Sequence, residues 1–401
     1  MATGPLSGVK VIEYSSFVAG PYCAKLLADM GADVLKVEAV KGDIARHRGP
    51  FKGTEANPEL SSVFLYENTN KKGVTLNTDT PTGAEIFKKL IADVDILIED
   101  QAPGYMESVG LGYETLKAIN PGLIMASITP FGQSGPYKDY KCYYLNTYHS
   151  SGAGYVLPAN SPDDSREPIK GGGYVGEADV GACTAVGVLA AMFHKNMTGE
   201  GQYIDISKQE AMMSLERMNI VRYYELGKSP SRVKINRLRD VLLHCKDGGF
   251  VKIVLHPDKQ WKGVVKALGY PEWTNEEIYQ NHRSREENFE ELTRRLQSEA
   301  DKYDTDELFN LVAAEGTACA PVCSAEQVFN SPHTKERGYY TEIDHPAAGK
   351  LMYPGLPFHV SEGETSGNFG APLLGQDNEE IYGKLGYGKK DLVKLREAGV
   401  I

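Results

Sequence analysis

The chain has 401 residues, of which 41% are hydrophobic and 24% are charged, an ordinary composition for a globular protein with room for two domains. Its formal net charge of −11 argues against nonspecific binding to nucleic acid or to an anionic membrane, but leaves room for a local basic pocket. No signal peptide pattern and no apolar run of membrane-spanning length is visible, so we expect a cytoplasmic protein.

The six cysteines do not form a metal-binding pattern. Only Cys319 and Cys323 are close in sequence, and no second ligand pair stands at zinc spacing. We therefore expect incidental or buried thiols in a reducing compartment, no metal and no tightly bound cofactor.

The first half of the chain alternates between strand and helix patterns. Residues 9–14 and 33–38 predict strands, and a helical pattern from Pro21 to Met30 lies between them. Further helices and strands are expected at 82–91, 95–99, 113–120 and 123–129. This βαβ order predicts a doubly wound parallel sheet. The first turn lacks a GxGxxG run, which leaves a nicotinamide dehydrogenase as a weak alternative.

Two loops in this half carry basic and polar side chains. The segment 40–66 reads as a loop that contains Arg46, and the run ENTNKKGVTLN places Asn70, Lys71 and Lys72 ahead of a short strand. Lysines and side-chain amides on such a loop could meet phosphates and a purine edge. An exposed, solvated turn explains the same composition equally well.

The run CYYLNTYHSSGAGYV is dense in aromatic and hydroxyl side chains. Tyr143, Tyr144, Tyr148 and His149 could line a pocket for an acid with an apolar or aromatic portion. A packed, half-buried helix is the alternative for the same pattern.

A glycine-rich loop then leads to an apolar segment from Ala178 to Lys195, which predicts a buried helix. Glu177 stands at its start, where free backbone N–H groups favour an ionised, oriented carboxylate, and Gly176 allows close approach of another molecule. Such a carboxylate suits covalent acyl transfer. An acid that only stabilises the first helical turn is the simpler account of the local pattern.

The second half begins differently. Residues 226–239 are basic and poor in apolar side chains, which suggests a linker into a second domain and not a nucleic-acid patch, since interleaved aromatics are missing. A hairpin is expected around residues 247–249, and charged helices between 276 and 314.

Six stretches in a fixed order resemble the class III CoA-transferases, the carnitine- and bile-acid-inducible type. They are LSGVKVIEYSSFVAGPYCAKLLADMGADVLKVE, NTNKKGVTLN, GLGYETLKAINPGLIMASITPFGQSGP, VLAAMFHKNMTGEGQYIDIS, the CKDG turn and APLLGQDNEEI. The resemblance implies a large Rossmann-like, CoA-binding domain from 1–225 and 330–401, and a smaller α+β domain from 226–329 with linkers. It also implies two interlocked protomers with the site at the domain and subunit junction.

In that family an aspartate in a GDxxxG setting attacks the acyl-CoA thioester, and the resemblance places Glu177 at this position. The extra methylene moves the attacking oxygen by on the order of an ångström. Asp179 is the fallback, on another face of the helix. The implied activity moves CoA from a donor such as succinyl-CoA to an organic acid through an enzyme-bound anhydride. An aryl- or alkyl-substituted dicarboxylate, such as an aryl-succinate, is one candidate acceptor.

The resemblance also implies which residues meet coenzyme A, the substrate that carries the acyl group. They are Ser16, Phe17, Val18, Ala19, Arg46, Asn70, Lys71, Lys72, Asp100, Gln101 and Tyr144. The implied substrate pocket consists of Tyr143, Tyr148, His149 and Gly176. Two basic positions of the family are Ala39 and Ser108 here, which weakens the anchoring of a phosphate group.

Two alternatives exist within the family, and these departures support the first of them. The chain could be a structural or regulatory subunit that pairs with an Asp-bearing relative in a heteromer. An active CoA-transferase with Glu177 as nucleophile would instead form a homodimer. It could also resemble the α-methylacyl-CoA racemases, which pair a histidine with the aspartate. Tyr143 stands at the histidine position, which disfavours racemisation.

Overall fold

The computed structural model describes residues 4–159, 161, 165–215, 217–229, 231–232, 240–363 and 369–401. The chain divides into two compact units. Unit 1 comprises Met1–Ala159, Asp164–Arg232 and Gly338–Ile401, and unit 2 comprises Asn160–Asp163 and Val233–Arg337. The predicted domain limits after residues 225 and 329 stay predictions, and most of the expected linker at 226–239 lies outside the described residues.

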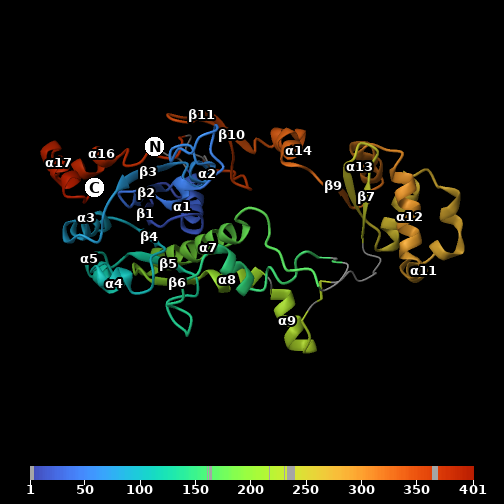
Figure 1. Cartoon of the computed structure of the whole chain (residues 1–401), viewed down its shortest axis with the longest axis horizontal. Helices are drawn as coiled ribbons and strands as arrows, with labels where there is room; N and C mark the ends of the chain where they lie inside the picture. The colour runs from blue at the N-terminus through green and yellow to red at the C-terminus, as the bar shows by residue number, and fades with distance from the viewer. Residues whose placement is uncertain are drawn as a thin grey trace. The chain divides into compact units, whose positions relative to one another are not determined.

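Unit 1 is built around a six-stranded sheet of order β3-β2-β1-β4-β5-β6, in which all neighbouring strands are parallel (Figure 1). The strands are β1 (Lys10–Tyr14), β2 (Asp33–Glu38), β3 (Lys71–Thr75), β4 (Ile96–Glu99), β5 (Ile124–Thr129) and β6 (Tyr203–Ser207). The strand order reverses between β1 and β4, as in doubly wound sheets. The predicted α/β class with a parallel sheet is therefore confirmed.

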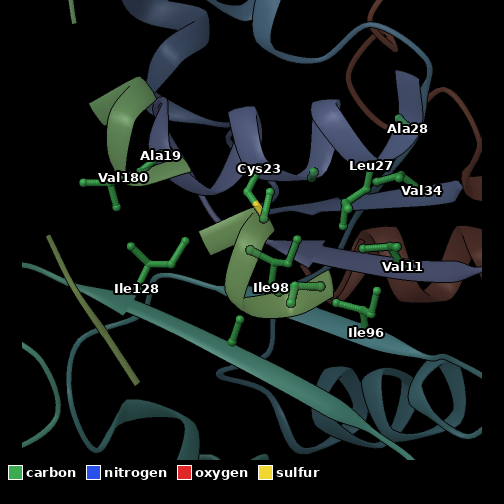
Figure 2. Packing of buried hydrophobic residues seen from close by; sticks show 14 of the residues in the cluster. Val11, Ala19, Cys23, Leu27, Ala28, Val34, Ile96, Ile98, Ile128 and Val180 are labelled. Carbon is green, nitrogen blue, oxygen red and sulfur yellow. The ribbon is translucent and has the colours of Figure 1, made fainter. Parts of the chain in front are cut away.

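Buried apolar residues alternate between the two faces of this sheet. Val11 belongs to the cluster on one face and Ile12 to the cluster on the other, as expected for a strand with a side-chain period of two. Helices α1 (Ala19–Asp29) and α7 (Val175–Thr198) cover the first face. Figure 2 shows Leu27 of α1 and Val180 of α7 in this cluster with Ile98 of β4.

The second face is covered by helices from both ends of the chain. They are α3 (Pro81–Ile91), α4 (Tyr105–Ser108), α5 (Tyr113–Ile119), α16 (Asn378–Lys384) and α17 (Lys389–Glu397). The hydroxyl of Tyr382 on α16 donates a hydrogen bond of 2.7 Å to the carbonyl of Thr75 on β3. The C-terminal segment thus packs on the edge strand of a sheet that the N-terminal half makes (Figure 1).

Helix α7 is not buried all round, so the expectation of a wholly buried helix is wrong. Its inner face packs closely on α1, because a Cβ at Gly181 would lie only 2.6 Å from the carbonyl oxygen of Ala19. On its outer face Val186 is 69% exposed and Phe193 is 67% exposed. The helix has the length and hydropathy of a membrane span, but its inner face belongs to the core of unit 1.

Unit 1 is completed by short elements around this framework. They are η1 (Ile44–His47), α2 (Ser62–Glu67), α6 (Tyr144–Ser150), α8 (Lys208–Leu215), α9 (Arg217–Leu226), β10 (Tyr340–His345) and β11 (Gly349–Pro354). The segment 40–66 is therefore not a plain loop, since it holds a 3-10 helix and a short α-helix. Helices α8 and α9 follow β6 in the chain.

Unit 2 has an antiparallel sheet of order β7-β8-β9 with its own core. Its elements are β7 (Asp240–His244), β8 (Phe250–Val254), α10 (Asp258–Ala267), η2 (Glu272–Asn275), η3 (Glu277–Tyr279), α11 (His282–Glu287), α12 (Phe289–Ala300), α13 (Thr305–Ala314), β9 (Cys319–Pro321), α14 (Ala325–Asn330) and α15 (Pro332–Glu336). The β7–β8 pair forms the hairpin that the sequence predicts around residues 247–249.

Candidate active site

A pocket of about 490 Å³ lies within unit 1, at the carboxyl ends of the parallel strands. Its wall includes Ser16 after β1, Asp100 after β4, Pro130 after β5 and Lys208 after β6. The strand order reverses between β1 and β4, and this is where open α/β sheets bind ligands.

The loop after β1 is fixed by two carboxylates. The amide of Ser16 donates to Asp100 Oδ2 at 2.9 Å, and the amide of Phe17 donates to Asp43 Oδ1 at 2.9 Å. Phe17 has φ 70°, a left-handed conformation that is uncommon for a bulky residue, and its ring packs edge-on against Tyr174 at 4.8 Å between centroids. Because such a backbone needs support, these bonds explain how the loop keeps Ser16 and Phe17 at the pocket.

Behind this loop lies a buried ion-pair network. Glu13 is 2.7 Å from Lys36 and 2.7 Å from Lys71, and Lys36 is 2.9 Å from Asp43. Burial by itself raises the pKa of Glu13, but the charges of the two lysines hold this pKa below its ordinary value. Lys36 of this network holds Asp43, and Asp43 in turn accepts the hydrogen bond that positions Phe17.

Glu177 lies in the first turn of α7 and lines the pocket. Its residue is 1% exposed, and its Oε2 atom is 2.8 Å from Lys208 Nζ. The side chain of Lys208 is 14% exposed and lines the same pocket. The pair holds one carboxylate in one orientation at the pocket wall, which is what a nucleophile in covalent acyl transfer requires.

Asp179 does not line this pocket. It is half-buried, and burial raises its pKa above the ordinary value. Gly176 lies beside Glu177 but is buried and outside the pocket lining, and a Cβ there would be 3.0 Å from both Met212 and Tyr148. The geometry thus favours Glu177 over Asp179 as the group that can meet a ligand.

Asp100 is the second carboxylate of the pocket. Burial raises its pKa to about 6, against the opposing charge of Lys208 and the hydrogen bond from the Ser16 amide. At neutral pH most of its population is therefore ionised. The pocket then holds two carboxylates, Glu177 and Asp100, together with the cation of Lys208.

The aromatic run forms only part of the wall. Tyr143 and Tyr144 line the pocket, Tyr143 being 79% exposed, and Tyr174 joins them from the glycine-rich loop. Tyr148 is buried beside Tyr144, with 5.8 Å between ring centroids, and does not line the pocket. His149 is exposed and also lies outside the lining.

The structure does not bring the expected phosphate-binding residues to this pocket. Arg46 is fully buried and holds Glu38 through two bonds of 2.7 and 2.8 Å. Lys71 is 1% exposed and belongs to the network around Glu13. Asn70 is buried and donates to Asp29 at 2.6 Å. These side chains are engaged within unit 1, so their polarity in the sequence reflects buried pairing.

Four further residues named from the resemblance also lie outside the lining. Val18 and Ala19 are each 1% exposed at the start of α1. Lys72 is partly exposed and pairs with Glu380 at 2.9 Å. Gln101 donates to the carbonyl of Tyr14 at 3.3 Å.

Sequence reasoning missed two cations of the pocket, Lys208 and Arg48. Lys208 directly follows Ser207, the last residue of a parallel strand, and this position could have identified it. Arg48 is exposed, and among the residues that the structure describes it has no ion-pair partner. Arg46 and Arg48 stand in the same loop, so the sequence does not show that Arg46 is buried and paired while Arg48 lines the pocket.

Comparison with known proteins gives a consistent set of similarities. A profile described as CoA-transferase family III matches residues 6–378. The chain is 32% identical to a succinyl-CoA–D-citramalate CoA-transferase of Chloroflexus aurantiacus, over 99% of this chain and 98% of that protein. It is 27% identical to a formyl-CoA:oxalate CoA-transferase of Escherichia coli, over 98% of each chain.

Solved structures agree with this pattern. A CAIB/BAIF family protein from Brucella suis superposes with a TM-score of 0.84 at 30% identity, over 96% of this chain and 100% of that chain. Rv3272 from Mycobacterium tuberculosis superposes with a TM-score of 0.78 at 25% identity, over 94% of this chain and 99% of that one. The similarity thus covers nearly the whole chain in both sequence and fold.

Proposed function

The chain belongs to CoA-transferase family III, and we propose that it is an enzyme that moves CoA from an acyl-CoA to an organic acid with Glu177 as its covalent nucleophile. The observation that supports this role is the position of Glu177, a carboxylate 1% exposed that lines the pocket at the sheet's reversal point and is oriented by Lys208 at 2.8 Å. The profile match over residues 6–378 and the relative that is 32% identical confirm the family resemblance found in the sequence.

The proposed cycle begins when the Glu177 carboxylate attacks the carbonyl carbon of the thioester. The C–S bond breaks, the CoA thiolate leaves, and an acyl–glutamyl anhydride forms. The thiolate then attacks the side-chain carbonyl of Glu177, which releases the donor acid as a carboxylate and leaves a glutamyl–CoA thioester. An acceptor carboxylate reverses both steps, giving its own CoA thioester and free Glu177.

We propose succinyl-CoA as the donor and a substituted dicarboxylate as the acceptor, with an alkyl- or aryl-succinate as the type. The name of the relative that is 32% identical supports a dicarboxylate acceptor, because citramalate is a methyl-substituted dicarboxylate. The tyrosines at the pocket, Tyr143, Tyr144 and Tyr174, offer apolar ring surface to such a substituent. We propose that the acyl-CoA thioester reaches Glu177 past Ser16 and Phe17, which line the same pocket.

We also propose that two copies of the chain associate through the outer face of α7 and through α9. Exposed apolar side chains on these helices support this proposal, since a monomer rarely leaves such surface open. They are Val186, Phe193, Met197, Met218, Val221 and Tyr224. The interlocked form of this dimer remains a proposal from the family resemblance.

Trapping of the covalent intermediate tests the catalytic proposal. Wild-type protein is mixed with succinyl-CoA and hydroxylamine, and peptide mass spectrometry locates the hydroxamate. We expect it on Glu177 in the wild type and in D179N, and nowhere in E177Q. The D179N variant is the matched control, since Asp179 lies in the same helix outside the pocket lining.

Two results would contradict the proposal. A hydroxamate on Asp179 would show that Asp179, and not Glu177, is the nucleophile. No hydroxamate on the wild-type chain alone, with turnover restored by an Asp-bearing relative, would identify the chain as a non-catalytic subunit. Exchange of the α-proton of a branched acyl-CoA with deuterium would instead indicate a racemase.

A further inference from the structure

Lys208 has one carboxylate at salt-bridge distance among the described residues, that of Glu177. Both side chains are largely withdrawn from water, at 14% and 1% exposure, so solvent screens the pair weakly. Asp100 is the other carboxylate whose charge Lys208 influences, and Cys142 also faces this cation. The carboxylate of Glu177 is therefore the direct partner of the Lys208 side chain in the free enzyme.

Every covalent intermediate of the proposed cycle removes that charge. In the anhydride and in the glutamyl–CoA thioester, the side chain of Glu177 is a neutral acyl group. Lys208 then keeps its positive charge in a mostly buried position without its partner, which is unfavourable. At this stage the carboxylate of the donor acid leaves the side-chain carbonyl carbon of Glu177, and later the carboxylate of the acceptor acid attacks the same carbon.

Arg48 adds a second cation to the same wall. Among the residues that the structure describes, the charged groups that line the pocket are Arg48, Lys208, Asp100 and Glu177. Two cations therefore face two carboxylates before reaction, and two cations face one carboxylate while Glu177 is acylated. An anionic substrate with a second carboxylate fits the acylated state better than a monocarboxylate does.

We propose that Lys208 passes from Glu177 to the reacting carboxylate of the acid substrate, and that Arg48 binds a second, remote carboxylate, so that the pocket selects dicarboxylates. This inference rests on the proposed function, because it needs an acylated Glu177. It assigns to Lys208 direct contact with the carboxylate of the substrate while Glu177 is acylated, beyond its contact with Glu177 in the free enzyme.

Isotope exchange separates the two half-reactions. Transfer of labelled succinate into succinyl-CoA measures the full exchange, and hydroxylamine trapping with succinyl-CoA measures acylation of Glu177 alone. In K208M we expect exchange to fall roughly 10- to 100-fold more than acylation, the range of a lost hydrogen bond to a charged group. K208R should recover most of the exchange, and K138M, an exposed lysine outside the lining, should match the wild type.

The dicarboxylate preference is tested by comparing labelled succinate with labelled butyrate, each with its own CoA thioester, and glutarate with valerate. We expect each dicarboxylate to exchange at least roughly tenfold faster than its matched monocarboxylate in the wild type. R48L should remove most of this preference, by slowing exchange of each dicarboxylate at least roughly tenfold more than exchange of its matched monocarboxylate.

The outcomes are distinguishable from failure of the proposed function. If the wild type forms no hydroxamate on Glu177, the proposed function itself fails. If the hydroxamate forms but K208M slows acylation and exchange equally, Lys208 only holds Glu177 and the inference is overturned. If neither dicarboxylate exchanges faster than its matched monocarboxylate, the role of Arg48 is overturned.

Discussion

The backbone amide of Ser16 donates a hydrogen bond of 2.9 Å to Oδ2 of Asp100, although 84 residues separate them in the chain. Ser16 follows β1 and Asp100 follows β4, the two neighbouring strands between which the sheet order reverses. The bond joins the loops that follow these two strands. The pocket is therefore shaped by the loops of the central strands.

Removing the acceptor of this bond should loosen the loop after β1. In D100A the Ser16 amide loses its partner, and we expect a loss of about 1–2 kcal/mol in the free energy of unfolding. D100N keeps a side-chain oxygen at the same place and should lose less than half of that. Urea denaturation at pH 7 measures both variants, and equal stability of the two would contradict the role of this bond.

We expect Arg46 to stabilise the folded protein and not to bind the substrate. R46M leaves Glu38 buried without its two bonds, and we expect a loss of about 3–5 kcal/mol in the free energy of unfolding. R48L, two residues away on an exposed side chain, should change it by less than about 0.5 kcal/mol. If R46M is as stable as the wild type but binds acyl-CoA more weakly, Arg46 contributes to ligand binding and the structural role is wrong.

Two glycines of α7 should respond in opposite ways. In G181A the new methyl meets the Ala19 carbonyl at 2.6 Å, and we expect a loss of about 1–3 kcal/mol in stability. In G187A the nearest atom is Ile204 Cγ2 at 3.8 Å, so helix propensity should raise stability by up to about 1 kcal/mol. Thermal unfolding of the two variants measures the difference, and a stable G181A would refute the close packing of α1 on α7.

Glu67 should make stability depend on pH. Burial raises its pKa to about 8, and its Oε2 atom has no hydrogen-bond partner among the described residues. The folded state therefore retains the proton to higher pH than the unfolded chain, where the ordinary value is 4.5. Its contribution to stability is fully present below about pH 4.5 and is lost as the pH rises through about 8.

We accordingly expect E67Q to match the wild type near pH 4.5 and to exceed it by about 2–4 kcal/mol near pH 9. E397Q removes an exposed carboxylate of α17 and should follow the wild type at both pH values. Urea titrations across this range measure the effect. A difference between E67Q and the wild type that does not change with pH would show that Glu67 is ionised in the folded protein throughout.

The outer face of α7 should hold a second copy of the chain. V186E places a charge on this face, where Val186 is 69% exposed, and we expect it to shift a dimer toward monomer in light scattering. V393E makes the same change on α17, where Val393 is 54% exposed, and should leave the dimer intact. A wild type that is monomeric at micromolar concentration would overturn this proposal.

The sequence was sufficient for the sheet and its order of elements because strand and helix periodicity is a local property. It was not sufficient for Arg46 and Lys71, which were predicted to contact the phosphates of coenzyme A, with an exposed turn as the alternative for Lys71. Glu13, the partner of Lys71, lies 58 residues earlier in the chain, so only the folded sheet reveals that the lysine is buried and paired.

The candidate site was partly accessible for the same reason. Glu177 could be singled out because it stands between a glycine-rich loop and an apolar helix. Lys208 directly follows a strand of the sheet, a position that could have marked it, but its pairing with Glu177 spans 31 residues and is visible only in the folded chain. The outer face of α7 was misjudged as buried, because an apolar composition on all sides does not say which neighbour covers each side.

The contact between α16 and β3 has a consequence for biosynthesis. Gly73 and Thr75 on the edge of the sheet bond to Asp377 and Tyr382, which leave the ribosome only after the whole of unit 2 has been made. The edge strand β3 therefore stays uncovered while about 300 further residues are translated. During this interval the growing polypeptide is most in need of chaperones, and a premature stop codon near its end would leave the edge open for good.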